Sequence, residues 1–171
     1  MSLKPAVSTT DHKQGKKDAD IVIVEYGDYQ CPYCGAAYPV LKKMMNKYGN
    51  QIQFVFRNFP LSEMHQYARP AAIVAEAAAL QGKFWEMHDA IYENQQYLSE
   101  NLLVELTEKL ELDSEQFNSD IKKSEVAAKV DSDFESGIMS GVNGTPSLFV
   151  NGTKFNGGPE DLLQLISEIV K

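Results

Sequence analysis

The only two cysteines of this 171-residue chain restrict its fold more than any other feature. They stand in the run Cys31-Pro-Tyr-Cys34, between two segments of different periodicity. Residues 21–26, IVIVEY, form a β-branched run that is typical of a strand covered on both faces. After the cysteines, apolar side chains recur at helical spacing until Gly49, which predicts the end of a helix. The sequence therefore predicts a strand, a dithiol and a helix in direct succession.

The segments that follow predict an α/β fold. Residues 51–59 alternate like a strand and complete a βαβ unit. Residues 62–140 are helical in pattern almost throughout, in several pieces. The signals that divide these pieces are Pro70, Gly82, Ser99, Asp113 and Gly137.

The last part of the chain returns to strands and ends in a helix. In residues 146–155 the pair Asn151-Gly152 lies between two short β-like runs and predicts a tight hairpin. Residues 159–170 predict an amphipathic helix. Its expected buried side consists of Leu162, Leu163, Leu165, Ile166 and Ile169. The predicted order is therefore βαβ, helices, ββα.

The start of the chain is polar up to residue 20 and is predicted to be a loose arm ahead of one domain at 21–171. This arm lacks the apolar centre of a secretory signal, so the chain, if complete, is expected to be cytoplasmic. The formal net charge is −8 and the lysine pairs are flanked by acids, so no nucleic-acid partner is expected. No apolar run approaches the ~18 residues of a membrane span, so no membrane insertion is expected.

A Cys-x-x-Cys pair has three ordinary uses, namely zinc binding, a structural disulfide and redox exchange. A closed zinc site needs four ligands, and the chain adds only His12, His65 and His88, which are not spaced as a pair. A disulfide across two intervening residues closes a very short loop and removes little entropy from the unfolded chain. Redox exchange is favoured, with no metal and no organic cofactor expected.

The expected position of Cys31 supports redox exchange. At the N-terminal edge of a helix, unpaired backbone N–H groups and the helix dipole stabilise a thiolate. Pro32 suits the first helical position because it has no N–H to leave unpaired. Cys34 lies one turn into the helix and is expected to be more shielded. Cys31 is thus the expected nucleophile and Cys34 the resolving cysteine.

The motif CPYC and residues 21–57 resemble the first half of a thioredoxin fold. The run GVNGTPSLFVNG resembles the strand that carries a cis-proline opposite the dithiol in thioredoxin-like proteins, and Pro39 matches the kink of their active-site helix. The helical stretch between the halves, and Glu25 six residues before Cys31, are similar to the DsbA-like branch. The resemblance covers most of the chain and implies a thioredoxin fold with an α-helical insertion at about 62–140.

The resemblance also implies roles for the matching residues. Cys31 forms a mixed disulfide with the substrate, which Cys34 then releases. Thr145 and Pro146 form a cis peptide beside the dithiol, where the Thr145 backbone pairs with an extended substrate. Without a dithiol, Pro146 would instead be interpreted as the start of an edge strand.

Glu25 lies late in an otherwise apolar strand, where burial of an ionised carboxylate is unfavourable and raises its pKa. The resemblance implies that it shuttles the proton of Cys34. The alternative is a carboxylate that simply reaches solvent at the end of the strand.

Pro32 and Tyr33, between the two cysteines, are also expected to contact substrate. Tyr33 departs from the DsbA pattern, which has His at this position. A phenol is neutral at pH 7 and adds no positive charge beside the thiolate. The sequence therefore predicts a Cys31 pKa that is less depressed, and a disulfide that is less oxidising, than in the His-bearing relatives.

These observations favour a DsbA-like protein thiol-disulfide oxidoreductase that acts on protein or peptide substrates and needs a redox partner to regenerate it. The alternatives are a thioredoxin- or glutaredoxin-like disulfide reductase, a non-catalytic peptide-binding module and a zinc-binding protein. The resemblance suggests a periplasmic or extracytoplasmic location. The apolar stripe around Trp85 and His88 is predicted to be core. His65 is predicted to lie at the surface, with a position facing the dithiol as the alternative.

Overall fold

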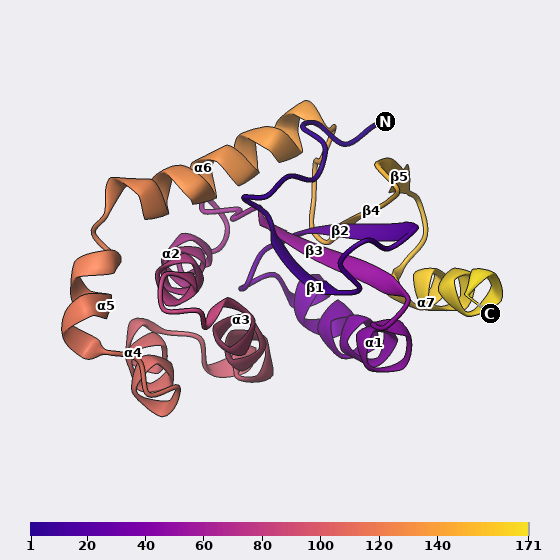
Figure 1. Ribbon diagram of the computed structural model, residues 1–171. Helices are drawn as coiled ribbons and strands as arrows, with labels where there is room; N and C mark the ends of the chain where they lie inside the picture. Colours follow the sequence, from indigo (N-terminus) through magenta and orange to yellow (C-terminus); the bar gives the residue numbers. More distant parts are fainter. Residues whose placement is uncertain (171) are drawn as a thin grey trace.

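A mixed five-stranded sheet forms the centre of the molecule. The computed structural model describes residues 1–170. Within them the sheet has the order β1-β3-β2-β4-β5 (Figure 1). The strands are β1 (His12–Gly15), β2 (Ile21–Gly27), β3 (Ile52–Asn58), β4 (Ser147–Val150) and β5 (Thr153–Phe155). β2 and β3 are parallel, and the other neighbours are antiparallel.

Helices cover both faces of this sheet. α1 (Pro32–Tyr48) and α7 (Pro159–Ile169) lie on one side, and α6 (Ser124–Met139) lies on the other (Figure 1). The remaining helices are α2 (Ala68–Ala79), α3 (Phe84–Glu93), the 3-10 turn η1 (Gln95–Tyr97), α4 (Glu100–Lys109) and α5 (Ser114–Asp120). None of the helices within residues 1–170 is both long and apolar enough to cross a bilayer.

The predicted order βαβ, helices, ββα is confirmed, with α2 to α6 inserted between β3 and β4. The predicted caps Ser99 and Asp113 accept hydrogen bonds from backbone N–H groups of α4 and α5, at 3.1 and 2.8 Å. The hairpin is also confirmed. Asn151 and Gly152 have φ angles of 47° and 78°, and the two-residue type I′ turn requires positive φ at both positions.

Two expectations about helices are wrong. Gly137 does not end a helix but lies inside α6. A Cβ at this position would lie 2.5 Å from the Phe59 ring, so the glycine lets α6 approach the loop after β3 closely. Ile169 is 48% exposed, because α7 buries a narrow stripe through Leu162 and Ile166.

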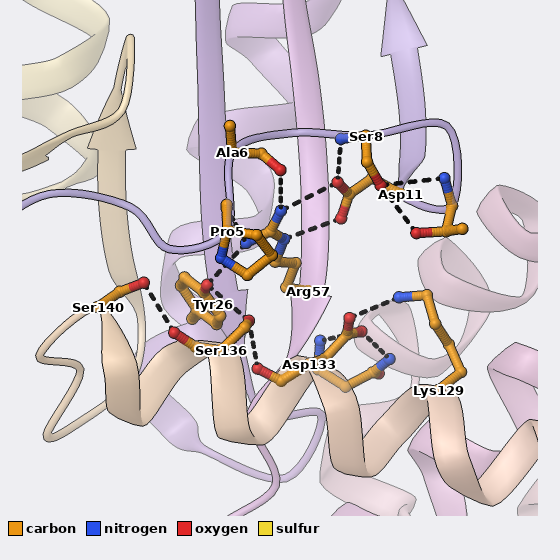
Figure 2. A network of polar contacts seen from close by, with 12 residues as sticks. Pro5, Ala6, Ser8, Asp11, Tyr26, Arg57, Lys129, Asp133, Ser136 and Ser140 are labelled. Atoms are coloured by element: carbon orange, nitrogen blue, oxygen red, sulfur yellow. Dashed lines mark hydrogen bonds and ion pairs between the residues drawn. The ribbon is translucent and has the colours of Figure 1, made fainter.

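The prediction of a loose arm at residues 1–20 is also wrong. β1 pairs antiparallel with β3, and the Leu3 N–H donates to the Gly152 carbonyl. Asp11 joins a buried ion pair, in which Arg57 Nε and Nη2 lie 2.8 and 3.0 Å from its two carboxylate oxygens (Figure 2). In the sequence, polar residues that contact a buried arginine look the same as polar residues in solvent. The polar composition of residues 1–20 therefore gave the wrong prediction of a loose arm.

The sheet divides the apolar core in two. Ile23 and Phe56 belong to a larger core that includes side chains of α1 and α3. Val24 and Tyr26 belong to a smaller core on the face covered by α6. Because successive residues of a strand point to opposite faces, Glu25 faces the larger core and its neighbour Tyr26 the smaller one.

Candidate active site

The dithiol occupies the first turn of α1. Cys31 is the N-cap residue of this helix, and Pro32 occupies its first position. Cys34 is completely buried, whereas Cys31 keeps 4% of its surface exposed. Cys31 is therefore the more accessible sulfur of the pair, as expected.

Asp28 holds the loop ahead of the dithiol, and sequence reasoning missed it. Its buried side chain accepts hydrogen bonds from the backbone N–H groups of Gln30 and Cys31, at 2.8 and 3.2 Å. Its other carboxylate oxygen accepts from the Leu61 N–H at 2.9 Å and lies 2.7 Å from His65 Nδ1. An Asp shortly before a helix start is a known signal for such a turn. The expected surface position of His65 is wrong, because the Asp28 contact leaves its side chain only 16% exposed.

Gln95, the second residue that sequence reasoning missed, fixes the same loop from η1. Its Nε2 donates to the carbonyl oxygens of Tyr29 and Cys31, at 2.9 and 2.8 Å. A Cβ on Gly35 would lie 2.0 Å from Gln95 Oε1, so the glycine provides the room for this contact. No local pattern marks Gln95, because it acts on a segment 64 residues away.

Thr145 and Pro146 lie beside the dithiol, just before β4. Their peptide bond is cis, as the resemblance implies, and the Thr145 carbonyl oxygen lies 3.4 Å from Cys31 Sγ. A groove of about 440 Å³ adjoins them, with Leu148 and Pro159 in its lining. Tyr33 also lines the groove and is 76% exposed. Pro32 is exposed and is not part of the groove lining.

The surroundings of Cys31 favour its thiolate. The pKa of Cys31 falls to about 5, mainly because the Cys34 thiol donates a hydrogen bond to the Cys31 sulfur. Burial opposes the charge, while the backbone N–H groups of Cys34 and Tyr33 stabilise it. Cys31 is therefore ionised at neutral pH.

Cys34 and Glu25 are held in their neutral forms. Burial, followed by the hydrogen bond to Cys31, raises the pKa of Cys34 far above its ordinary value. Glu25 is only 2% exposed, and burial together with the charge of Cys31 raises its pKa to about 8. The alternative that Glu25 reaches solvent is wrong, and the expected rise in its pKa is present.

An aromatic layer lies beneath the dithiol. The rings of Tyr29, Phe56, His88 and Tyr92 pack with centroids 4.7 to 6.4 Å apart. Within the described residues, the Tyr29 and Tyr92 hydroxyls and His88 Nε2 are buried without a hydrogen-bond partner. The predicted core stripe of α3 is confirmed, except that Trp85 is only partly buried.

The site therefore combines one ionised sulfur, one protonated sulfur and one buried carboxyl group. Two sulfurs at this spacing can store two electrons as a disulfide. No group of three or more His, Cys, Asp or Glu side chains in residues 1–170 is arranged to hold a metal ion.

Known proteins share sequence similarity with this chain along most of its length. A protein-family model described as Thioredoxin matches residues 7–168. The Na(+)/H(+) antiporter NhaA 3 of Salinispora tropica is 39% identical over 153 residues, which cover 90% of this chain and 23% of the antiporter. The chain thus spans about a quarter of the length of the curated relatives it matches.

Solved structures share the fold along almost the whole chain. A thioredoxin-like oxidoreductase from Silicibacter pomeroyi DSS-3 is 26% identical with a TM-score of 0.80, and the match covers 94% of this chain and 92% of that one. The thiol-disulfide exchange protein alpha-DsbA2 from Wolbachia pipientis is 21% identical with a TM-score of 0.83, over 95% and 88% of the two chains. The predicted fold class, a thioredoxin fold with a helical insertion, is confirmed.

Proposed function

This chain belongs to the thioredoxin family, and we propose that it is a thiol-disulfide oxidoreductase that acts on protein or peptide substrates. One observation carries the proposal, namely that Cys31 has the ionised and less deeply buried sulfur, whereas the sulfur of Cys34 is protonated and fully buried. The Silicibacter pomeroyi protein is a thioredoxin-like oxidoreductase and the Wolbachia pipientis protein is a thiol-disulfide exchange protein, which supports the same chemistry here.

The reaction begins at Cys31. Its thiolate attacks one sulfur of a substrate disulfide, a bond forms between the two sulfurs, and the other substrate sulfur leaves as a thiolate. The groove beside Pro146 receives the substrate chain, whose extended backbone pairs with Thr145. Tyr33 supplies exposed ring surface to this groove.

The second half of the reaction depends on the proton of Cys34. Once Cys31 is in the mixed disulfide it carries no charge, so the pKa of Glu25 is no longer raised by that charge. Glu25 ionises more readily and accepts the Cys34 proton. The Cys34 thiolate attacks Cys31 Sγ, the second substrate thiolate leaves, and the protein holds the disulfide. A redox partner then reduces this disulfide. When the same steps run in reverse, the protein donates its disulfide to a substrate dithiol.

The electrostatics of Cys31 favour disulfide donation over reduction. A low thiol pKa stabilises the reduced protein and makes its disulfide more oxidising. The Cys31 pKa of about 5 lies between the values of about 3.5 for DsbA and about 7 for thioredoxin. We therefore propose a disulfide that is oxidising but weaker than in the His-bearing DsbA pattern.

Trapping the mixed disulfide tests the proposal. Cys34→Ser, mixed with a peptide disulfide, should accumulate a peptide adduct on Cys31 that appears in the mass spectrum and disappears with dithiothreitol. Cys31→Ser is the matched control and should form no adduct. A peptide-binding module would instead show no adduct in Cys34→Ser and undiminished peptide affinity in Cys31→Ser. Equilibration of the wild type in glutathione redox buffers gives the reduction potential.

A further inference from the structure

Glu25 must lose a proton between the two halves of the proposed reaction, yet its side chain is almost inaccessible. It is 2% exposed, and in the reduced protein burial and the Cys31 thiolate keep it protonated at neutral pH. After Cys31 enters the mixed disulfide, this carboxyl must ionise before it can accept the proton of Cys34. A buried acid exchanges its proton with solvent more readily when side chains or a water molecule relay that proton.

A small cavity adjoins Glu25 on the dithiol face of the sheet. Its volume is about 10 Å³, which is close to the space that a single water molecule requires. The polar groups in its lining include Glu25 from β2, Tyr38 and Lys42 from α1, and His88 and Asp89 from α3. The cavity therefore connects the buried acid to charged groups on two helices.

His88, which lines this cavity, has an unused hydrogen-bond acceptor. Its Nδ1 lies 3.0 Å from Asp89 Oδ1. Although burial opposes it, the contacts with His88 and Lys42 lower the pKa of Asp89, which is ionised and can only accept. Nδ1 therefore carries the hydrogen, and Nε2 keeps its lone pair. This Nε2 atom is buried and has no hydrogen-bond partner within the described residues.

The Asp89 side chain connects His88 to the protein surface. Its other carboxylate oxygen pairs with Lys42 Nζ, and the Lys42 and Asp89 side chains are 37% and 20% exposed. The Tyr38 hydroxyl, next to them, donates to Glu93 at 3.0 Å. A proton that reaches Asp89 is thus in contact with solvent, whereas a proton on Glu25 is not.

We propose that the cavity binds one water molecule between Glu25 and His88, and that this water, His88 and Asp89 form the route by which Glu25 exchanges its proton with solvent. Glu25 gives its proton to the water, and the water gives one to His88 Nε2. His88 releases its Nδ1 proton to Asp89, which passes it to solvent. No electron moves, and the reverse transfer during reduction of the disulfide restores the starting tautomer. His88 and Asp89 are positioning residues that act through Glu25.

This inference rests on the proposed function, and one single-turnover experiment tests it. The disulfide reagent DTNB releases one coloured thiolate when Cys31 attacks it and a second when Cys34 resolves the mixed disulfide. The first phase therefore reports on Cys31, and the second reports on the proton that passes through Glu25. His88→Phe removes the acceptor but keeps a ring, and Asp89→Asn removes the partly exposed charge.

At pH 7, His88→Phe is expected to slow the second phase about tenfold, below the usual range for a direct general base because His88 acts through Glu25. Asp89→Asn should slow the same phase, and both variants should keep the wild-type first phase and reduction potential. Tyr92→Phe is the matched control on α3, because it removes a buried unpaired hydroxyl that does not line the cavity. It should leave both phases unchanged.

A double variant separates a proton route from a packing effect. Glu25→Gln alone should slow the second phase, and adding His88→Phe should slow it no further, because both residues handle the same proton. The inference is overturned if His88→Phe leaves the second phase unchanged, slows both phases equally or adds to the effect of Glu25→Gln. Failure of the proposed function gives a different result, since the wild type would then release fewer than two thiolates.

Discussion

The two faces of the sheet bury polar groups in opposite ways. On the face covered by α6, each of the five N–H groups of Arg57 has an acceptor (Figure 2). These acceptors are the Asp11 carboxylate, the Pro5 and Ala6 carbonyls and the Tyr26 hydroxyl. The Tyr26 hydroxyl also contacts Ser136 Oγ of α6 at 2.8 Å. This network is complete, and it ties the N-terminal segment and α6 to the sheet.

The dithiol face buries polar groups without completing their hydrogen bonds. One residue before Tyr26 in β2, Glu25 is held as a neutral acid rather than as half of an ion pair. Around it, the hydroxyls of Tyr29 and Tyr92 and the Nε2 atom of His88 have no partner within the described residues. Such groups reduce stability, because a buried polar atom loses its hydrogen bonds to water.

The difference between the faces shows that the dithiol face, where the proposed reaction takes place, is the one that loses stability through unpaired polar groups. A complete network resists any change in charge, because every donor already has its acceptor. The proposed thiol exchange needs the reverse, since it requires a thiol and a carboxyl group to change protonation state in each turnover. Neighbouring residues of one strand can serve a complete network and a changing protonation state, because successive side chains point to opposite faces of the sheet.

The largest effect is expected from a substitution that breaks the complete hydrogen-bond network around Arg57. Arg57→Met leaves the Asp11 carboxylate, which is 4% exposed, without its counter-ion. The free energy of unfolding should fall by about 3–5 kcal/mol, as for other broken buried ion pairs. The reduction potential should keep its wild-type value, because Arg57 faces away from the dithiol. Urea unfolding and glutathione equilibration measure the two quantities. Arg57→Met with Asp11→Asn should recover part of the loss, and a shifted potential would show that the faces are coupled.

Glu25→Gln should have the opposite effect on stability. Folding raises the pKa of Glu25 from 4.5 to about 8, so the folded protein keeps a proton that the unfolded chain loses as the pH rises. The wild-type carboxyl therefore destabilises the reduced protein by about 3 kcal/mol at pH 7 and by almost nothing at pH 4. The variant should be more stable by that amount at pH 7 only. Urea unfolding of both proteins at the two pH values tests this, and an equal gain at both would contradict it.

The sequence was a better guide to the dithiol face than to the opposite one. The Cys31 and Cys34 pair, Glu25 and the Thr145-Pro146 dipeptide each lie in a short segment whose pattern, or resemblance to the thioredoxin fold, marks it. The order of strands and helices was predictable for the same reason, because periodicity, caps and turns are local signals.

What the sequence concealed depends on contacts between distant segments. Asp11 and Arg57 are 46 residues apart, and Gln95 acts on Cys31 from 64 residues away. A polar residue whose partner is distant has the same local pattern as a polar residue in solvent. The arm at residues 1–20 therefore looked loose, and His65 looked exposed, although both are fixed by buried carboxylates.

Tyr33→His should change the reduction potential by acting on the dithiol face alone. The histidine would place a positive charge beside the Cys31 thiolate below its ordinary pKa of about 6.5 and none well above it. At pH 6 the reduction potential should rise by about 30 mV, a tenfold change in the equilibrium constant with glutathione, and by less at pH 8. Tyr33→Phe is the control and should keep the wild-type potential. A potential that is unchanged or lower in Tyr33→His contradicts the role assigned to this position.

The smallest effects come from removing one hydroxyl on each face. The Tyr26 hydroxyl accepts from Arg57 Nη1 at 3.0 Å and contacts Ser136 Oγ, so Tyr26→Phe leaves one buried N–H of Arg57 without its acceptor. Its free energy of unfolding should fall by about 1–1.5 kcal/mol. Tyr29→Phe removes a hydroxyl that has no partner within residues 1–170, so its stability should stay at the wild-type level or rise slightly. Urea unfolding of the two variants compares the faces directly. Equal losses of stability in the two variants would mean that the dithiol face is as completely hydrogen-bonded as the opposite face. Unpaired polar atoms would then no longer distinguish the two faces.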